Sequence, residues 1–253
     1  MEIPYAAKQI WRKPTSEYPE QFYSKKNAKR IRSTLARADE LNVVCEFTPL
    51  SADFLDWFSP MYVDLIGKKK NANLHDLYTK TLGSSNPTYD FWFLTVMMNN
   101  HRLGGAIIFA NAERLMIAYR AFLPKWPEGS LQASPSLYAE YMIAKNAFKL
   151  NKQQISHGKD RNLFGQNSSI GQLIYKLSVG YIPQLPVATV ADRIEMLTFE
   201  TSAAIEDTVV LHYPSTGDKI TEATLVTSRL NEEKYSQLLH YPELLKVTTV
   251  YRD

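Results

Sequence analysis

The sequence predicts an α+β fold in which helices cover both faces of a mixed, mainly antiparallel β-sheet. Residues 89–122 hold three aromatic and β-branched runs separated by short turn signals, a pattern typical of an antiparallel meander. Helical periodicity with start and stop signals occurs on both sides of that region. The predicted order is helix, strand, helices, three strands, helix, strand, helix and strand, which is a layered α+β arrangement.

The chain is predicted to begin with an arm and a basic helix. Residues 1–23 are rich in Pro, Tyr and Trp and show no clear period. Ser24 is an N-cap candidate, and the following residues share one helical face: Ala28, Ile31, Leu35 and Ala38. Six cations lie mostly elsewhere on the helix: Lys25, Lys26, Lys29, Arg30, Arg32 and Arg37. Such a run is typical of a solvated face, although it could also contact the phosphates of tRNA or of a carrier.

A strand and a second helix follow. Val43–Phe47 is a strand candidate, and its Cys45 is expected to be a buried thiol because no signature of a catalytic cysteine surrounds it. Ser51 caps the helix and Gly67 ends it. Pro60 is expected to kink or split this helix.

A short helix near Leu74–Leu82 leads into the predicted meander. Its strands are Tyr89–Met98, Leu103–Ala110 and Arg114–Phe122. The pair Asn99-Asn100 is the turn signal between the first two.

The segment from Ala133 to Pro183 is predicted to hold helix, strand, polar loop and helix. Ser134 followed by Pro135 is a strong helix start. The buried stripe of that helix is expected to be Leu137, Tyr141, Ala144 and Phe148. Gln153–His157 is a short strand. The next helix is capped by Ser168 or Ser169, closed by Gly180, and expected to pack inward through Ile170, Leu173, Ile174 and Leu177.

Strand-like runs dominate the remaining chain: 187–190, 194–201, 207–213, 220–228 and 245–251, with a short helix near Asn231–Leu239. We expect residues 1–23 to be an arm, residues 24–190 to be the core, and residues 191–253 to complete the same domain.

Composition limits the classes of protein. With 45% hydrophobic and 22% charged residues, the chain can bury a real core and is not disordered. Its net charge of +3 permits an anionic ligand without demanding nucleic acid. No apolar run approaches the roughly 20 residues of a membrane span, and the N-terminus lacks the apolar core of a secretion signal, so a cytoplasmic enzyme is expected.

Common chemical motifs are missing. Four histidines are dispersed, without Cys or carboxylate partners at ligand spacing, so no metal is expected: His75, His101, His212 and His240. The chain has no phosphate-binding P-loop, dinucleotide fingerprint, kinase motif set or Gly-x-Ser-x-Gly elbow.

Over residues 24–190 the sequence resembles the GNAT acyltransferase superfamily, and more closely its branch of Fem-type peptidoglycan-bridge aminoacyltransferases and BioF2-like acetyltransferases. The pieces that carry the resemblance are Ser134-Pro135, Ile155–Gly158, Asn162–Gly165, Lys176–Gly180 and the early basic helix. The glycine-rich pyrophosphate motif usual in GNAT enzymes is absent from the loop before Ser134.

The resemblance implies a sheet that splays apart between its fourth and fifth strands. The pantetheine arm of acyl-CoA, or of an acyl-phosphopantetheine carrier, would lie along Phe122 and Leu123. Its phosphates would meet the free N–H groups of the following helix, helped by Ser134 and Ser136. Each serine could instead serve only its own helix. Asn162 and Gly165 would shape the polar loop or contact the donor.

The resemblance also supplies candidate catalytic residues. His157, at the end of the fifth strand, would be a general base that Lys159 and Asp160 orient, or else a structural histidine. Lys176 would stabilise the oxyanion of the tetrahedral adduct, or else be a solvated lysine. Tyr181 would act as an acid toward the leaving thiolate.

The sequence thus favours an acyltransferase that moves an acyl group from a thioester carrier, acyl-CoA or an acyl carrier protein, to an amine of a small molecule or peptide side chain. One alternative is a Fem-like aminoacyltransferase that uses aminoacyl-tRNA. Another is a non-catalytic GNAT-like scaffold that binds a peptide or a partner.

Overall fold

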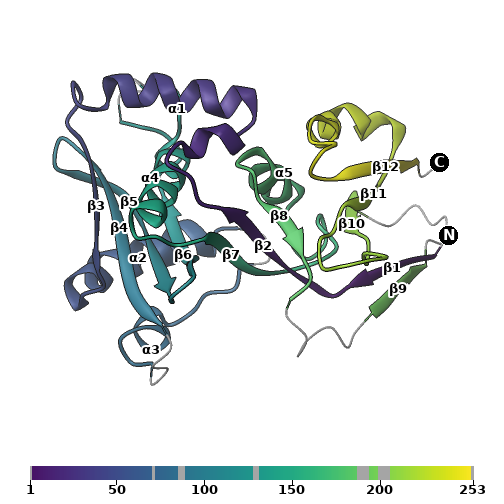
Figure 1. Cartoon of the computed structure of the whole chain (residues 1–253), viewed down its shortest axis with the longest axis horizontal. Coiled ribbons are helices and arrows are strands. Elements are labelled where there is room, and N and C mark those ends of the chain that lie inside the picture. The colour runs from purple at the N-terminus through teal and green to yellow at the C-terminus, as the bar shows by residue number, and fades with distance from the viewer. Residues whose placement is uncertain are drawn as a thin grey trace. The chain divides into compact units, whose positions relative to one another are not determined.

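A computed structural model of the chain describes residues 2–69, 72–84, 89–127, 131–186, 194–198 and 206–251 (Figure 1). The chain forms two compact units. The central unit is Pro14–His157, and the terminal unit combines Met1–Lys13 with Gly158–Asp253. These bounds differ from the expected division at 23 and 190, because strands from the two ends of the chain pair with each other.

The central unit is built on strands in the order β3 (Val43–Pro49), β4 (Asp90–Met98), β5 (His101–Ala110), β6 (Arg114–Phe122) and β7 (Gln154–Arg161). The first four are antiparallel neighbours, which confirms the predicted meander. Asn99 and Asn100 both have positive φ, as a two-residue hairpin turn requires.

The sheet forks between β6 and β7. These strands are parallel, and their register holds only three pairs, which end at Met116 and Ser156. β6 continues to Phe122 beyond this point, and β7 continues from the central unit into the terminal unit after His157. The splayed strands that the resemblance implies are therefore present.

One face of the central sheet is covered by α2 (Ala52–Gly67), whose Phe54 and Phe58 pack on Ile107 and Ala121. The helix is not split at Pro60. Pro60 has no N–H to donate to the carbonyl of Asp56, four residues earlier. Asp56 is exposed, so water can satisfy that carbonyl. The short helix α3 (Leu77–Lys80) follows, capped by Asp76.

The other face is covered by α4 (Pro135–Lys149), which contacts β3 to β6, while α1 (Lys25–Ala38) and the 3-10 turn η1 (Pro19–Phe22) pack against α4. Strand residues pointing away from α2, such as Leu94 and Ile108, are fully buried, so both faces are covered. Phe148 is 44% exposed, so its predicted burial is wrong. Phe148 lies in the last turn of α4, where Ala147 is the buried residue instead.

The terminal unit contains three sets of paired strands. β1 (Glu2–Ala6) pairs with β9 (Ile194–Thr198), and β2 (Lys8–Pro14) pairs with β8 (Ile182–Gln184). β10 (Thr208–Leu211), β11 (Glu222–Thr227) and β12 (Lys246–Tyr251) form a further sheet. Its helices are α5 (Ile170–Ser178), capped by Ser169, and the 3-10 helix η2 (Arg229–His240).

Residues 1–23 were expected to be an arm without period, yet they hold β1, β2 and η1. β1 and β2 pair with β9 and β8, which lie 170 or more residues away, and no local pattern reveals these pairings. The strand predicted over 187–190 lies outside the described residues. None of the described helices combines the length and apolar character of a transmembrane helix.

Candidate active site

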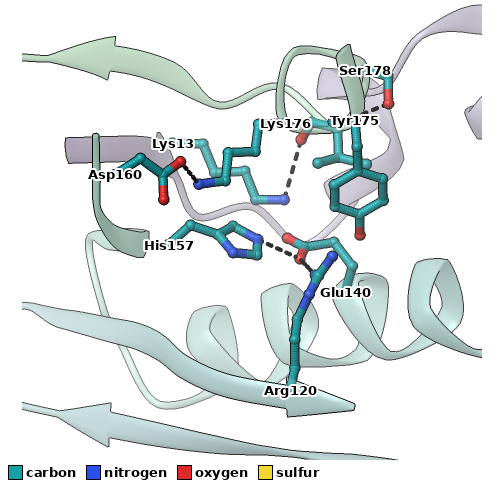
Figure 2. Close-up of polar contacts among 9 residues, drawn as sticks. Lys13, Arg120, Glu140, His157, Asp160, Tyr175, Lys176 and Ser178 are labelled. Carbon is teal, nitrogen blue, oxygen red and sulfur yellow. Dashed lines mark hydrogen bonds and ion pairs between the residues drawn. The ribbon is translucent and has the colours of Figure 1, made fainter. Parts of the chain in front are cut away.

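A buried carboxylate links α4 to β6 and β7 in the central unit. Glu140 Oε2 lies 3.0 Å from His157 Nε2 and 3.3 Å from Arg120 Nη1. The Glu140 side chain is 0% exposed, that of His157 7% and that of Arg120 27%. Figure 2 shows Arg120 and His157 reaching Glu140 from different strands. This Arg120–Glu140–His157 network lies where β6 and β7 cease to pair.

The local sequence explains why Glu140 is inside. Ser134 accepts a hydrogen bond from the Leu137 N–H at 3.2 Å and fixes the start of α4. Leu137, Tyr141 and Ala144 then turn one face of the helix inward, and Glu140 lies on it. A buried carboxylate costs several kcal/mol unless it is paired. The two nitrogens that contact Oε2 supply that pairing.

The network determines which ring nitrogen of His157 is basic. Beside a guanidinium, Glu140 is ionised and can only accept hydrogen bonds. Neutral His157 therefore carries its proton on Nε2, so Nδ1 is its basic nitrogen. The partner of His157 in this network is thus Glu140, whereas the sequence suggested Lys159 and Asp160. The pKa of Lys69 is lowered, first by desolvation and second by the positive charge of Arg120. Lys69 is therefore a further basic group close to Arg120 of β6.

Lys176 has its own carboxylate in the terminal unit. Its side chain is 3% exposed and forms an ion pair with Asp160, whose side chain is 13% exposed (Figure 2). The ammonium nitrogen also lies 5.2 Å from the ring centroid of Trp11. The alternative of a solvated lysine is therefore wrong, because Lys176 is buried and paired.

Tyr181 and Lys13 lie in the same unit. Tyr181 follows α5 and is 0% exposed. Lys13 Nζ lies 4.4 Å from the centroid of its ring and donates to the Val179 carbonyl at 3.2 Å. The structure thus brings Lys176 and Tyr181 into one unit with Asp160, and places His157 at the end of the other unit.

Asn162 and Gly165, predicted to contact the donor, have clear structural roles. The Asn162 amide donates to the carbonyls of Ala6 and Leu211 and accepts from the N–H groups of Leu163 and Leu211. These bonds use all its donors and acceptors. Gly165 has φ +107°, and a Cβ there would lie 1.9 Å from the Asp207 carbonyl oxygen.

The other predicted donor contacts lie in the central unit. Phe122 ends β6, and the N–H of Leu123 bonds to the Leu103 carbonyl at 2.8 Å. Ser134 caps α4, and Ser136 is half-buried in its first turn. Donor binding by these residues remains a prediction.

Sequence reasoning missed Arg120 and Glu140. The available signal for Glu140 was a carboxylate on the apolar face of a helix, next to Tyr141. Arg120 carried no signal, since a cation in an alternating strand is ordinary. Among the described residues, no cluster of three or more His, Cys, Asp or Glu is placed to hold a metal ion.

No family model matches the chain, and no curated protein matches it. The crystal structure of FemX matches with a TM-score of 0.51 and 10% identity, covering 69% of this chain and 59% of FemX. A conserved protein of unknown function from Bacteroides thetaiotaomicron VPI-5482 matches with a TM-score of 0.47 and 14% identity, covering 78% of this chain and 60% of that one.

L-PGS from Bacillus licheniformis matches with a TM-score of 0.43 and 12% identity, covering 67% of this chain and 50% of that one. The chain therefore spans about 59% of the length of FemX and less of L-PGS. At these identities the likeness to FemX concerns the fold alone. The chain has a mixed α+β fold of the Fem and GNAT type, as the resemblance predicted.

Proposed function

We propose that this chain is an N-acyltransferase that moves an acyl group from a thioester carrier to an amine. The observation that carries the proposal is the contact between buried Glu140 and His157. His157 lies one residue after Ser156, the last residue of β7 that pairs with β6. A histidine held in one tautomer by a buried carboxylate is an arrangement that enzymes use for general-base catalysis. The fold shared with FemX is compatible with this chemistry.

His157 is the base in this proposal. The nitrogen of the acceptor attacks the thioester carbonyl, a C–N bond forms, and Nδ1 of His157 takes the proton that the nitrogen loses. The C–S bond then breaks, and the thiolate leaves with a proton returned from an acid. The charge gained by the imidazole is stabilised by Glu140, while Arg120 balances the charge of Glu140 before the reaction.

The remaining roles follow the resemblance. Lys176 is assigned to the oxyanion of the adduct and Tyr181 to protonation of the thiolate. The acyl donor, acyl-CoA or an acyl-phosphopantetheine carrier, is assigned to Phe122, Leu123 and the N-terminus of α4. The acceptor is an amine of a small molecule or a peptide side chain.

The test is turnover with a panel of acyl-CoA donors and amine acceptors, followed by mass spectrometry of the amide product. His157→Ala is expected to lower kcat by about 10²–10⁴-fold while donor binding survives, because the base acts in the chemical step. Lys176→Met is expected to lower kcat by about 10²–10³-fold. The exposed Lys80→Met is the matched control.

Two results would decide against this reading. Unchanged turnover in the double variant His157→Ala/Lys176→Met would remove the catalytic assignment. The absence of turnover with any thioester or aminoacyl-tRNA would favour a binding scaffold.

A second candidate donor is aminoacyl-tRNA, favoured by the sequence resemblance to Fem-type aminoacyltransferases and by the cations of α1. Binding of charged tRNA that weakens steeply with salt, together with transfer of its aminoacyl group, would establish it.

A further inference from the structure

The solvent-exposed side of α1 carries positive charge alone. Its basic face consists of Lys25, Lys26, Lys29, Arg30, Arg32 and Arg37, and no acidic residue occurs in Lys25–Ala38. Lys25, Lys26, Lys29 and Arg32 are exposed, and the Arg37 side chain is 50% exposed. Lys25, Lys29 and Arg32 form one row about 10 Å long at the helical rise of about 1.5 Å per residue.

Three of these cations, Lys25, Lys26 and Lys29, oppose the stability of their own helix. Lys25 and Lys26 occupy the first turn, where the helix dipole favours anions. Lys25 and Lys29 are like charges at a spacing of four, which repel. Of the six cations, Arg37 alone has a carboxylate partner within the described residues, Glu40 at 3.7 Å. A local conflict that no carboxylate among the described residues relieves, Glu40 apart, is typical of a functional surface.

We propose that the basic face of α1 docks an acyl carrier protein through an acidic helix. This inference rests on the proposed function, and it names the source of the acyl group as a protein-bound thioester. Rows of ammonium and guanidinium groups at spacings of three and four match a second helix that presents carboxylates at the same spacings. Such charge pairing fixes orientation and speeds encounter.

Two observations favour an acidic protein over other polyanions. The chain has 29 Lys and Arg against 26 Asp and Glu, so it is nearly neutral as a whole while α1 is locally basic. Its isoelectric point of 8.7 is below the values above about 9 that mark nucleic-acid-binding domains. An interfacial membrane helix would need its apolar side exposed. In α1 that side, with Ala28 and Ile31, is buried.

The test compares the full chain with the variant Lys25→Glu/Lys29→Glu/Arg32→Glu. The control, Lys80→Glu/Lys219→Glu/Lys246→Glu, changes the net charge equally at exposed positions outside α1. Binding to immobilised acyl-loaded carrier protein, bulk tRNA and phosphatidylserine vesicles is measured at low and high salt, with thermal melting as a check of folding. We expect carrier-protein binding to weaken about 100-fold in the α1 variant and to stay within about twofold in the control.

Each outcome separates the docking proposal from the proposed function. Loss of turnover with acyl-loaded carrier protein, with acyl-CoA turnover retained, supports both. Carrier-protein binding through α1 without turnover of any thioester supports docking and contradicts the acyltransferase. Turnover with acyl-CoA, with carrier-protein binding absent or equal in both variants, overturns docking alone. Binding of tRNA or vesicles through α1, without carrier-protein binding, also overturns docking.

Discussion

Removal of the Glu140 carboxylate should destabilise the central unit strongly. Glu140→Ala takes away the acceptor of both His157 and Arg120. Loss of one partner of a buried ion pair costs about 3–5 kcal/mol. Because the Arg120 side chain is 27% exposed and can regain water, we expect the lower end, about 3 kcal/mol. At about 2–4 °C per kcal/mol, the melting temperature should fall by about 6–12 °C.

The assay is urea unfolding followed by tryptophan fluorescence and far-ultraviolet circular dichroism. Glu140→Gln keeps the shape of the side chain and one acceptor oxygen, so we expect a loss of about 1–2 kcal/mol. The control is Glu40→Ala, which removes an exposed carboxylate 3.7 Å from Arg37 and should change the free energy of unfolding by less than about 0.5 kcal/mol. An effect of Glu140→Ala equal to that of Glu40→Ala would refute the reasoning.

Three further predictions concern other parts of the chain. Cys45 is half-buried, and desolvation raises the pKa of its thiol to about 12, so alkylation of the native thiol by iodoacetamide at pH 8 should be far slower than in urea; equal rates would contradict this. Burial lowers the pKa of His212, a larger effect than the opposing charge of Glu222. The unfolded state then binds more protons, so stability should fall as pH drops below about 6.5, the unfolded value, and His212→Asn should flatten this dependence in urea titrations. Gly165→Ala must displace the backbone at Asp207, so it should cost about 2–4 kcal/mol, and a neutral result in thermal melts would exclude the close approach.

The sequence was sufficient for the elements whose signals are local. Ser24, Ser51 and Ser134 each accept the expected hydrogen bond at a helix start, and Asn99-Asn100 forms the predicted turn. Side-chain capping and positive φ are properties of a few neighbouring residues, which is why such signals can be read without a structure.

Pairings between distant segments could not be predicted from the sequence. β1 meets β9, and Glu140 meets His157, through the topology rather than through any neighbouring residue. The predicted partner of His157 was Asp160, three residues along the same strand. Gly158, between the two residues, has φ +71°, which interrupts the extended backbone. Asp160 instead pairs with Lys176.

The discontinuous terminal unit has a consequence for the order of events during synthesis. The central unit is one unbroken stretch, Pro14–His157, so its meander can form as soon as those residues leave the ribosome. β1 must wait for Ile194–Thr198, almost two hundred positions later. Closing so long a loop is slow. Ribosome-bound chains should therefore protect the meander from protease well before the N-terminal strands acquire protection.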